Sequence, residues 1–225
     1  MSVRENIIEF NHRLKNCNCR LIAVSKTKPV DLILEAYEAG QLDFGENKVQ
    51  ELREKPDQLP QDIRWHMIGH LQTNKVKYIA PFIYLIHAVD SLKLLKEINK
   101  QALKNNRTIN CLLQVHIAEE AHKFGFEENE LYNLLNSNEL KSMENIKIIG
   151  LMGMATYTND RDQIRSEFQF LKKTFDSIKK KINLPNVAMN EISMGMSDDY
   201  PIALEEGSTM IRVGSKIFGP RIYRK

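Results

Sequence analysis

The most constraining feature of this sequence is a repeated alternation between short apolar runs and longer segments with a helical period. This alternation is typical of a parallel sheet built from β–α units, because parallel strands need a crossover connection that is usually a helix. Eight runs are predicted to be strands: Leu21–Ser25, Asp43–Gly45, Trp65–Ile68, Tyr84–Ala88, Cys111–Ile117, Ile146–Met152, Glu191–Met194 and Ile211–Gly214.

The segments that separate and follow these runs are predicted to be helices. They are Val30–Ala39, Val49–Glu54, Asn74–Ala80, Ser91–Asn105, Glu128–Leu135, Ile164–Ile182 and Asp198–Glu206, with a leading helix at about Arg4–Leu14 and a short one after Ser215. Eight such units predict an α/β fold, a closed (β/α)8 TIM barrel with an extra N-terminal helix packed on its outside. An open doubly wound sheet uses the same elements but predicts a glycine-rich loop after the first strand, and Ser25–Pro29 contains no glycine.

Composition places limits on the class of protein. The chain has 225 residues and no Pro/Gly/Ser-rich linker, so residues 1–225 are expected to form one domain. Because 32 Lys plus Arg face 29 Asp plus Glu, the net charge of +3 argues against a nucleic-acid surface. We find no secretory signal and no long apolar window, and therefore expect a soluble, cytoplasmic protein that makes no membrane contact. Cys17, Cys19 and Cys111 are expected to be free thiols, with no metal site.

Lys26 closes the first predicted strand and shares one strand face with Ile22 and Val24. An amine at the rim of an apolar face is partly desolvated, which disfavours its ammonium form and leaves a nucleophile able to form a Schiff base with an aldehyde. A pyridoxal phosphate lysine needs this property. The plainer interpretation is a strand-terminal lysine that reaches into solvent.

In a closed barrel the reactive residues gather at the carboxyl ends of the strands. Gly195-Met196-Ser197 follows the seventh predicted strand and Gly214-Ser215 follows the eighth, where loops of such barrels commonly bind a phosphate. Each loop alone is equally consistent with a turn glycine and a helix cap, but the adjacent pair favours a phosphate.

Arg212 lies on the face of the eighth strand that can point into the barrel, together with Met210 and Gly214. A buried arginine needs a partner, which is either an internal carboxylate or the ring nitrogen of a pyridine. A guanidinium can only donate to that nitrogen, so it would keep the ring unprotonated and weaken it as an electron sink.

Histidines 66, 70, 87 and 116 are candidates for acid–base or metal roles, because imidazole titrates near neutrality. Their spacing matches no ligand pattern, and we interpret them as hydrogen-bonded structural histidines. The specific roles of His70, His116 and Lys75 stay open.

The sequence closely resembles the pyridoxal phosphate homeostasis proteins, also called proline synthetase co-transcribed homologs, over nearly its full length. The matching segments are Ala23–Pro29, Phe44–Asn47, Trp65–Lys75, Gly150–Met152, Ser193–Asp199 and Arg212–Gly219. It departs from the common pattern of that family at His116–Ala118 and Thr156–Thr158.

The resemblance implies a barrel like the N-terminal domain of alanine racemase, in the fold-type III class, with pyridoxal 5'-phosphate bound to Lys26. It further implies that Arg212 faces the pyridine nitrogen, that Ser197, Gly214 and Ser215 bind the phosphate, and that Asn47 and the main chain at Met194 line the same pocket. It assigns no catalytic residue.

Three classes of function are weighed. The first is a monomeric protein that holds pyridoxal phosphate and passes it to apoenzymes without robust catalysis. The second is an amino-acid racemase or related enzyme of low activity, for which relatives use a tyrosine from a further β domain, and Lys225 follows Gly214 by only eleven residues. The third, a nucleic-acid or protein-binding module, is disfavoured by the even charge and by Lys26 with its phosphate loops.

Overall fold

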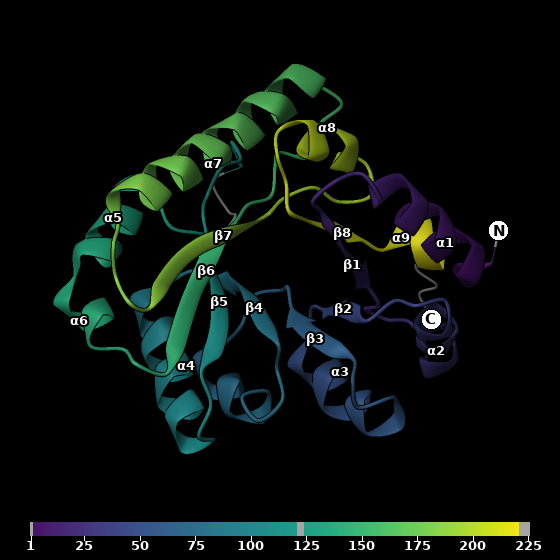
Figure 1. The fold of residues 1–225 in the computed structure, drawn as a ribbon, viewed down its shortest axis with the longest axis horizontal. Helices are drawn as coiled ribbons and strands as arrows, with labels where there is room; N and C mark the ends of the chain where they lie inside the picture. Colours follow the sequence, from purple (N-terminus) through teal and green to yellow (C-terminus); the bar gives the residue numbers. More distant parts are fainter. Residues whose placement is uncertain (1, 121–123, 221–225) are drawn as a thin grey trace.

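A computed structural model describes residues 2–120 and 124–220, and its centre is a closed barrel of eight parallel strands (Figure 1). The strands follow one another around the barrel in chain order. They are β1 Arg20–Val24, β2 Asp43–Glu46, β3 Arg64–Met67, β4 Leu85–Val89, β5 Ile109–Gln114, β6 Ile146–Met152, β7 Val187–Ser193 and β8 Met210–Val213. The predicted fold class is confirmed.

Pairing between the first and last strands closes the barrel. Leu21 lies opposite Ile211 and Ile22 opposite Arg212, in parallel register. Because every pair is parallel, the carboxyl ends of all eight strands gather at one end of the barrel, and the loops that follow them share that end.

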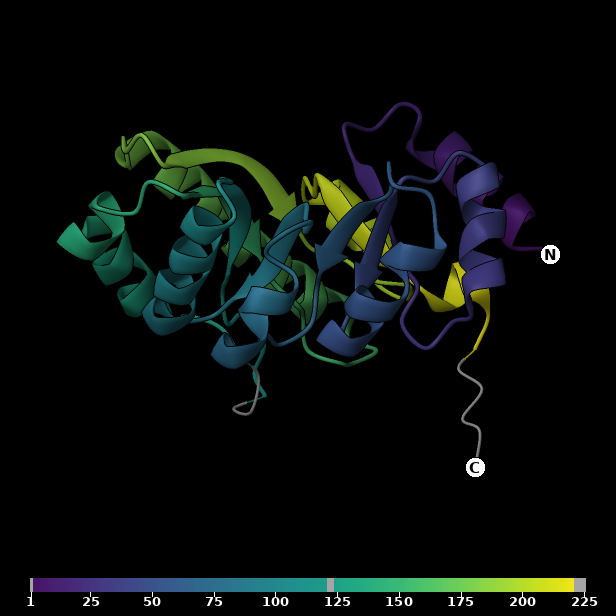
Figure 2. The same cartoon turned by 90° about the horizontal axis from the view of Figure 1, so that it is seen from below.

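The helices lie outside the ring of strands (Figure 1). They are α1 Val3–Leu14, α2 Val30–Glu38, α3 Val49–Glu54, α4 Leu92–Lys104, α5 Glu128–Asn136, α6 Asn138–Lys141, α7 Arg161–Lys181, α8 Tyr200–Glu205 and α9 Ser215–Phe218, with 3-10 turns η1 Pro56–Gln58 and η2 Thr73–Tyr78. The leading helix α1 packs against α2 and α9, so it covers the outside of the barrel near its closure (Figure 2). Among the described residues, no helix has the length and apolar character needed to cross a membrane.

Local sequence signals explain where several helices begin. Ser2 caps α1 in a reciprocal capping box with Glu5, and Asp160 accepts from two backbone N–H groups at the start of α7. Ser91 caps α4 by accepting from the N–H of Leu94, so the helix predicted from Ser91 begins one residue later.

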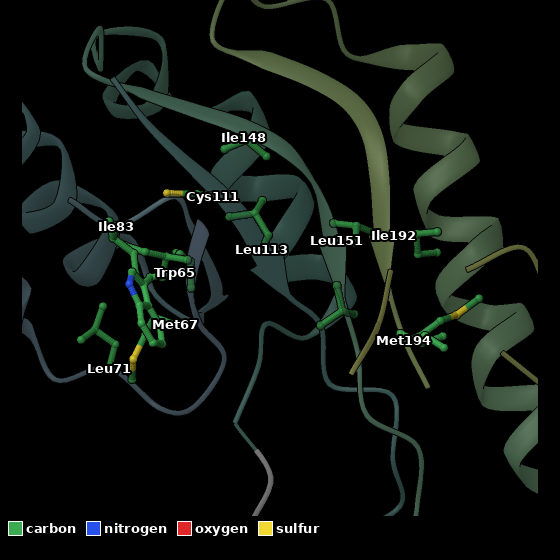
Figure 3. Close-up of a cluster of buried hydrophobic side chains, with 14 of the residues drawn as sticks. Trp65, Met67, Leu71, Ile83, Cys111, Leu113, Ile148, Leu151, Ile192 and Met194 are labelled. Carbon is green, nitrogen blue, oxygen red and sulfur yellow. The ribbon is translucent and has the colours of Figure 1, made fainter. Parts of the chain in front are cut away.

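The core has two parts. The larger part lies between the strands and the helices, and it contains the side chains labelled in Figure 3, from Trp65 to Met194. A smaller cluster fills the inside of the barrel with Ile22, Leu85, Ala88, Leu112, Met152 and Met210. Alternation along the strands separates the two parts, as expected for strands that are buried on both faces.

The structure corrects several predicted boundaries. Strand β5 ends at Gln114 rather than Ile117, because the chain beyond it turns to pair with Phe126. The segment predicted as a helix at Asn74–Ala80 is the 3-10 turn η2, in which Lys75 N–H donates to Gln72 O. The short elements η1 and α6 were not predicted, since four residues or fewer show no helical period.

Candidate functional site

A cavity of about 350 Å³ opens at the carboxyl ends of the strands. Its walls come from the ends of β1, β2, β3, β6, β7 and β8. The lining residues are Val24, Lys26, Lys28, Asn47, Ile68, Met154, Tyr157, Met196, Ser197, Asp198, Asp199, Arg212, Gly214, Ser215 and Gly219. Six of the seven residues predicted from the sequence to form one site are therefore brought together by the fold.

Lys26 is half-buried in this cavity and lies two residues beyond the end of β1. The residues on either side of it are held by hydrogen bonds to β2 and to α3. The N–H of Ser25 donates to Gly45 O at 3.1 Å. Thr27 has a φ of 63°, a left-handed conformation that β-branched residues rarely adopt, and its N–H donates to Glu51 Oε1 at 2.7 Å. These contacts fix the backbone from which Lys26 enters the cavity.

Glu46, the last residue of β2, anchors the same loop through Ser25 and Lys55. Its Oε1 accepts from Ser25 Oγ at 2.6 Å and from Lys55 Nζ at 2.8 Å, and Lys55 also donates to Ser25 O and to Glu51 Oε1. Burial raises the pKa of Glu46 to about 7, against the opposing effect of the Lys55 ammonium and the Ser25 hydroxyl. Its second oxygen, Oε2, is buried without a hydrogen-bond partner.

The loops after β7 and β8 meet at the cavity. Gly195 has a φ of 92°, and a Cβ there would lie 2.5 Å from the Cβ of Ala203, so only glycine fits this turn. The turn carries Ser197 toward β8, where its Oγ accepts from the N–H of Gly214 at 3.4 Å. Ser215 lines the cavity beside them. Hydroxyl and backbone N–H donors from two loops therefore converge, as the sequence predicted.

Arg212 supplies a buried guanidinium to the cavity wall, with 4% of its surface exposed. It donates from Nη1 to Ser193 O at 2.9 Å and to Ser193 Oγ at 2.6 Å, and from Nη2 to Gly153 O at 3.0 Å. Burial lowers the pKa of Arg212 to about 10, so it is still protonated at neutral pH. These partners are carbonyls and a hydroxyl rather than the carboxylate that one interpretation of the sequence expected.

Asn47 reaches the cavity from the end of β2. A Cβ on Gly69 would lie 2.6 Å from the backbone oxygen of Asn47 and 2.9 Å from its Cα. Glycine at 69 is therefore needed for the loop after β3 to pack directly on the backbone of Asn47, and this contact positions the amide.

Met194 is the one predicted site residue that the structure does not bring into the cavity lining. Its N–H donates to Met210 O and its carbonyl accepts from Ser208 Oγ, while its side chain packs in the outer core (Figure 3). Both main-chain groups of Met194 are occupied by these two hydrogen bonds, one to the backbone of β8 and one from the Ser208 side chain, which explains why they do not face the cavity.

Sequence reasoning did not place Met154, Tyr157 or Lys28 in the cavity wall, which all three line. Met154 and Tyr157 lie in the loop after β6, where Gly150 and Gly153 were the available signal. Lys28 Nζ donates to three carbonyls, those of Phe218, Gly219 and Pro220.

The four histidines considered as candidates, 66, 70, 87 and 116, lie outside this cavity lining. His66 and His87 are fully buried and hydrogen-bonded, as the sequence analysis expected. His70 contacts Asp90 and stacks on Phe124, and His116 contacts Glu127. Among the described residues, no group of three His, Cys, Asp or Glu side chains is arranged to hold a metal ion.

Comparison with known proteins defines the class to which this fold belongs. The family "Alanine racemase, N-terminal domain" matches residues 1–221. The racemase of Bartonella henselae, solved with covalently bound pyridoxal phosphate, superposes with a TM-score of 0.73 at 15% identity, covering 100% of this chain and 62% of that one. At this identity the likeness concerns the fold alone.

Within this class, the chain belongs to the pyridoxal phosphate homeostasis protein family. It is 39% identical to the Aquifex aeolicus member over 94% of this chain and 90% of that protein, and 38% identical to the human member over 92% and 78%. The structure of PipY from Synechococcus elongatus with PLP bound superposes with a TM-score of 0.87 at 33% identity, covering 97% of this chain and 100% of that one. The resemblance inferred from the sequence motifs is confirmed.

Proposed function

We propose that this protein binds pyridoxal 5'-phosphate in the cavity at the carboxyl ends of the strands and serves in the homeostasis of that cofactor. In this proposal Lys26 holds the cofactor as a Schiff base, and the protein has no robust catalytic activity. The observation that carries the proposal is the convergence of Lys26, Ser197, Gly214, Ser215 and Arg212 on one cavity.

The donor set fits the cofactor at three points. Lys26 offers an amine to an aldehyde, a reaction in which Nζ bonds to the aldehyde carbon and the aldehyde oxygen leaves as water. Ser197, Gly214 and Ser215 offer uncharged donors to a phosphate dianion. Arg212 offers donors to a ring nitrogen. When bound, the cofactor supplies an aldehyde and an aromatic ring that can withdraw electrons.

The character of Arg212 favours holding the cofactor over catalysis. A guanidinium has only donors, so it hydrogen-bonds a ring nitrogen without protonating it. An unprotonated ring is a weaker electron sink, which limits carbanion chemistry. The names of the relatives, homeostasis proteins rather than enzymes, agree with this assignment.

A visible absorption spectrum tests the binding site. The protein loaded with pyridoxal phosphate is expected to absorb well above the protein band. Borohydride reduction is expected to leave Lys26 heavier by one cofactor less one oxygen atom. Lys26→Ala should lose the adduct, while Lys28→Ala is the matched control because Lys28 lines the same cavity but donates to backbone carbonyls. An unchanged spectrum in Lys26→Ala would overturn the assignment.

Exchange of the α proton of alanine in heavy water tests the absence of robust catalysis. We expect no inversion at an enzymatic rate of order 1 per second. Tyr157 is the side chain to examine if inversion occurs, since it belongs to the cavity lining and a phenol is able to donate a proton. Inversion at such a rate that disappears in Tyr157→Phe would replace the carrier by a racemase.

We further propose that this protein is a single-domain, cytoplasmic monomer. In this proposal it passes the cofactor to pyridoxal phosphate-dependent apoenzymes. Its test is the rate at which such an apoenzyme regains activity from the loaded protein. A rate no greater than the rate of spontaneous cofactor release would contradict direct transfer.

A further inference from the structure

An unbroken line of polar side chains crosses the inside of the barrel and ends at Arg212. His66 Nε2 lies 3.0 Å from Asp43 Oδ1, and His66 Nδ1 lies 2.9 Å from His87 Nε2. His87 Nδ1 lies 3.0 Å from Ser193 Oγ, which lies 2.6 Å from Arg212 Nη1. These residues come from five strands, β2, β3, β4, β7 and β8.

All five side chains are withdrawn from solvent. His66, His87 and Ser193 have no exposed surface, and Asp43 and Arg212 are 3% and 4% exposed. Trp65 and Met67, the strand neighbours of His66, belong to the outer core (Figure 3), so alternation along β3 turns His66 to the inside.

The direction of every hydrogen bond follows from the Asp43 end of the line. Burial lowers the pKa of His66, and burial lowers the pKa of His87 well below its ordinary value, so both rings are neutral at pH 7. A carboxylate only accepts, so His66 donates from Nε2 and must accept at Nδ1. His87 then donates from Nε2 and accepts at Nδ1, which leaves the hydroxyl proton of Ser193 as the donor to His87.

The Arg212 end completes the same direction. A guanidinium only donates, and the oxygen of Ser193 has lone pairs left to accept from it once its own proton points to His87. At the opposite end, the Asp43 carboxylate is held by Arg64 Nη2 at 2.6 Å and lies 4.0 Å from Arg20 Nη1. The line thus joins a buried cation to a paired anion through three neutral groups.

We propose that Asp43, His66, His87 and Ser193 form a one-way hydrogen-bond chain that holds Arg212 as a fixed donor in the cavity wall. We call these four residues the barrel chain. They are positioning residues, because they act on the cavity only through Arg212. For the cofactor, the consequence of the barrel chain is that the ring nitrogen receives a hydrogen bond of fixed direction. This consequence rests on the proposed function.

Nitrogen NMR of the cofactor-free protein, labelled with ¹⁵N in its histidines, tests the direction of the chain. Both His66 and His87 should give the pattern of a neutral ring with its proton on Nε2. His66→Asn and His87→Gln assign the signals, and the exposed His70 provides an internal reference. A charged His66, or a proton on Nδ1 of either ring, would reverse the chain at His87 and overturn the proposal. The tautomers are read in the wild-type protein without bound cofactor, and the two variants serve only to assign the signals, so this measurement decides on the chain even if the proposed function fails.

A double-variant cycle tests whether the chain acts through Arg212. His87→Leu and Ser193→Ala should each weaken pyridoxal phosphate binding about tenfold and shift the visible absorption maximum, as expected when one charge-assisted hydrogen bond is weakened. In an Arg212→Met background, His87→Leu should cause no further loss. An equal loss with or without Arg212 would assign His87 to general packing and refute a positioning role. His87→Gln, whose amide can donate and accept, should restore most of the affinity.

Discussion

The raised pKa of Glu46, which holds the loop that carries Lys26, can be tested through the pH dependence of stability. A carboxyl whose pKa is higher in the folded protein than in the unfolded chain binds its proton more tightly when folded. The folded state therefore gains stability as pH falls and loses it as pH rises through the folded pKa. For Glu46 the two values are about 7 and an ordinary 4.5. Since one pH unit of difference is worth about 1.4 kcal/mol, the full effect is about 3 kcal/mol.

The Glu46→Gln variant isolates this effect, because an amide keeps an acceptor for Ser25 and Lys55 but does not titrate. Urea unfolding of both proteins from pH 5 to pH 8 gives the difference in their free energies of unfolding. Over that range we expect the wild-type protein to lose about 2–3 kcal/mol relative to the variant. Glu128→Gln, which makes the same chemical change on the exposed start of α5, controls for the substitution itself.

The outcome separates two opposing forces on one carboxyl. A difference that stays constant from pH 5 to pH 8 would mean that Lys55 keeps Glu46 ionised throughout, so the ion pair outweighs burial. A difference that moves the other way would mean a lowered pKa. Either result would refute the reasoning from burial.

Two further predictions concern the cavity wall. Gly69→Ala places a Cβ 2.6 Å from the backbone oxygen of Asn47. Because the backbone moves less readily than a side chain, we expect the variant to lose about 1–3 kcal/mol of stability and to bind the cofactor more weakly. Unchanged unfolding and binding curves would show that the loop after β3 moves freely. Ser197→Ala should weaken the binding of pyridoxal phosphate by about tenfold or more, because a charge-assisted hydrogen bond contributes roughly 1.5–3 kcal/mol. The binding of pyridoxal, which has no phosphate, should not change. Equal losses of affinity for both aldehydes in a binding titration would remove Ser197 from the phosphate site.

The strands were predictable because a parallel strand buried on both faces is a nearly continuous apolar run. Their exact ends were not, because pairing with a neighbour decides where a strand stops. Arg20 is not apolar, yet it belongs to β1 because its N–H donates to Thr209 O beside β8. In β7 the strand begins at Val187 because β6 is long enough to pair with it at Ile148.

The site was predictable to the extent that one rule gathers the carboxyl ends of barrel strands. That rule found Lys26, Ser197 and Gly214, which lie in the loops that follow β1, β7 and β8. It could not exclude Met194, whose main-chain groups are occupied by hydrogen bonds that only the structure reveals. It also missed Tyr157, since a loop of several residues gives no sign of which side chain returns to the cavity.

The faces on which the residues of the barrel chain lie can be recognised in the sequence. His66 stands between Trp65 and Met67, and Ser193 stands between Ile192 and Met194. Because successive side chains of a strand point to opposite faces, each polar side chain lies on the face opposite to that of its two apolar neighbours. What the sequence could not provide was the contact between them, because His87 and Ser193 are 106 residues apart. Strand periodicity fixes the face of a residue but not the height at which it meets another strand.

The inside of this barrel is thus divided between an apolar cluster, around Ile22 and Met210, and the polar barrel chain. Filling the whole interior with branched apolar side chains would stabilise the fold at least as well, since replacing buried ionic groups by packed hydrophobic ones is often neutral or stabilising. A polar line that is hydrogen-bonded at every step removes most of the cost of burial but gains little stability. The placement of its cationic end in the cavity wall therefore points to a role in the chemistry of that cavity rather than in folding.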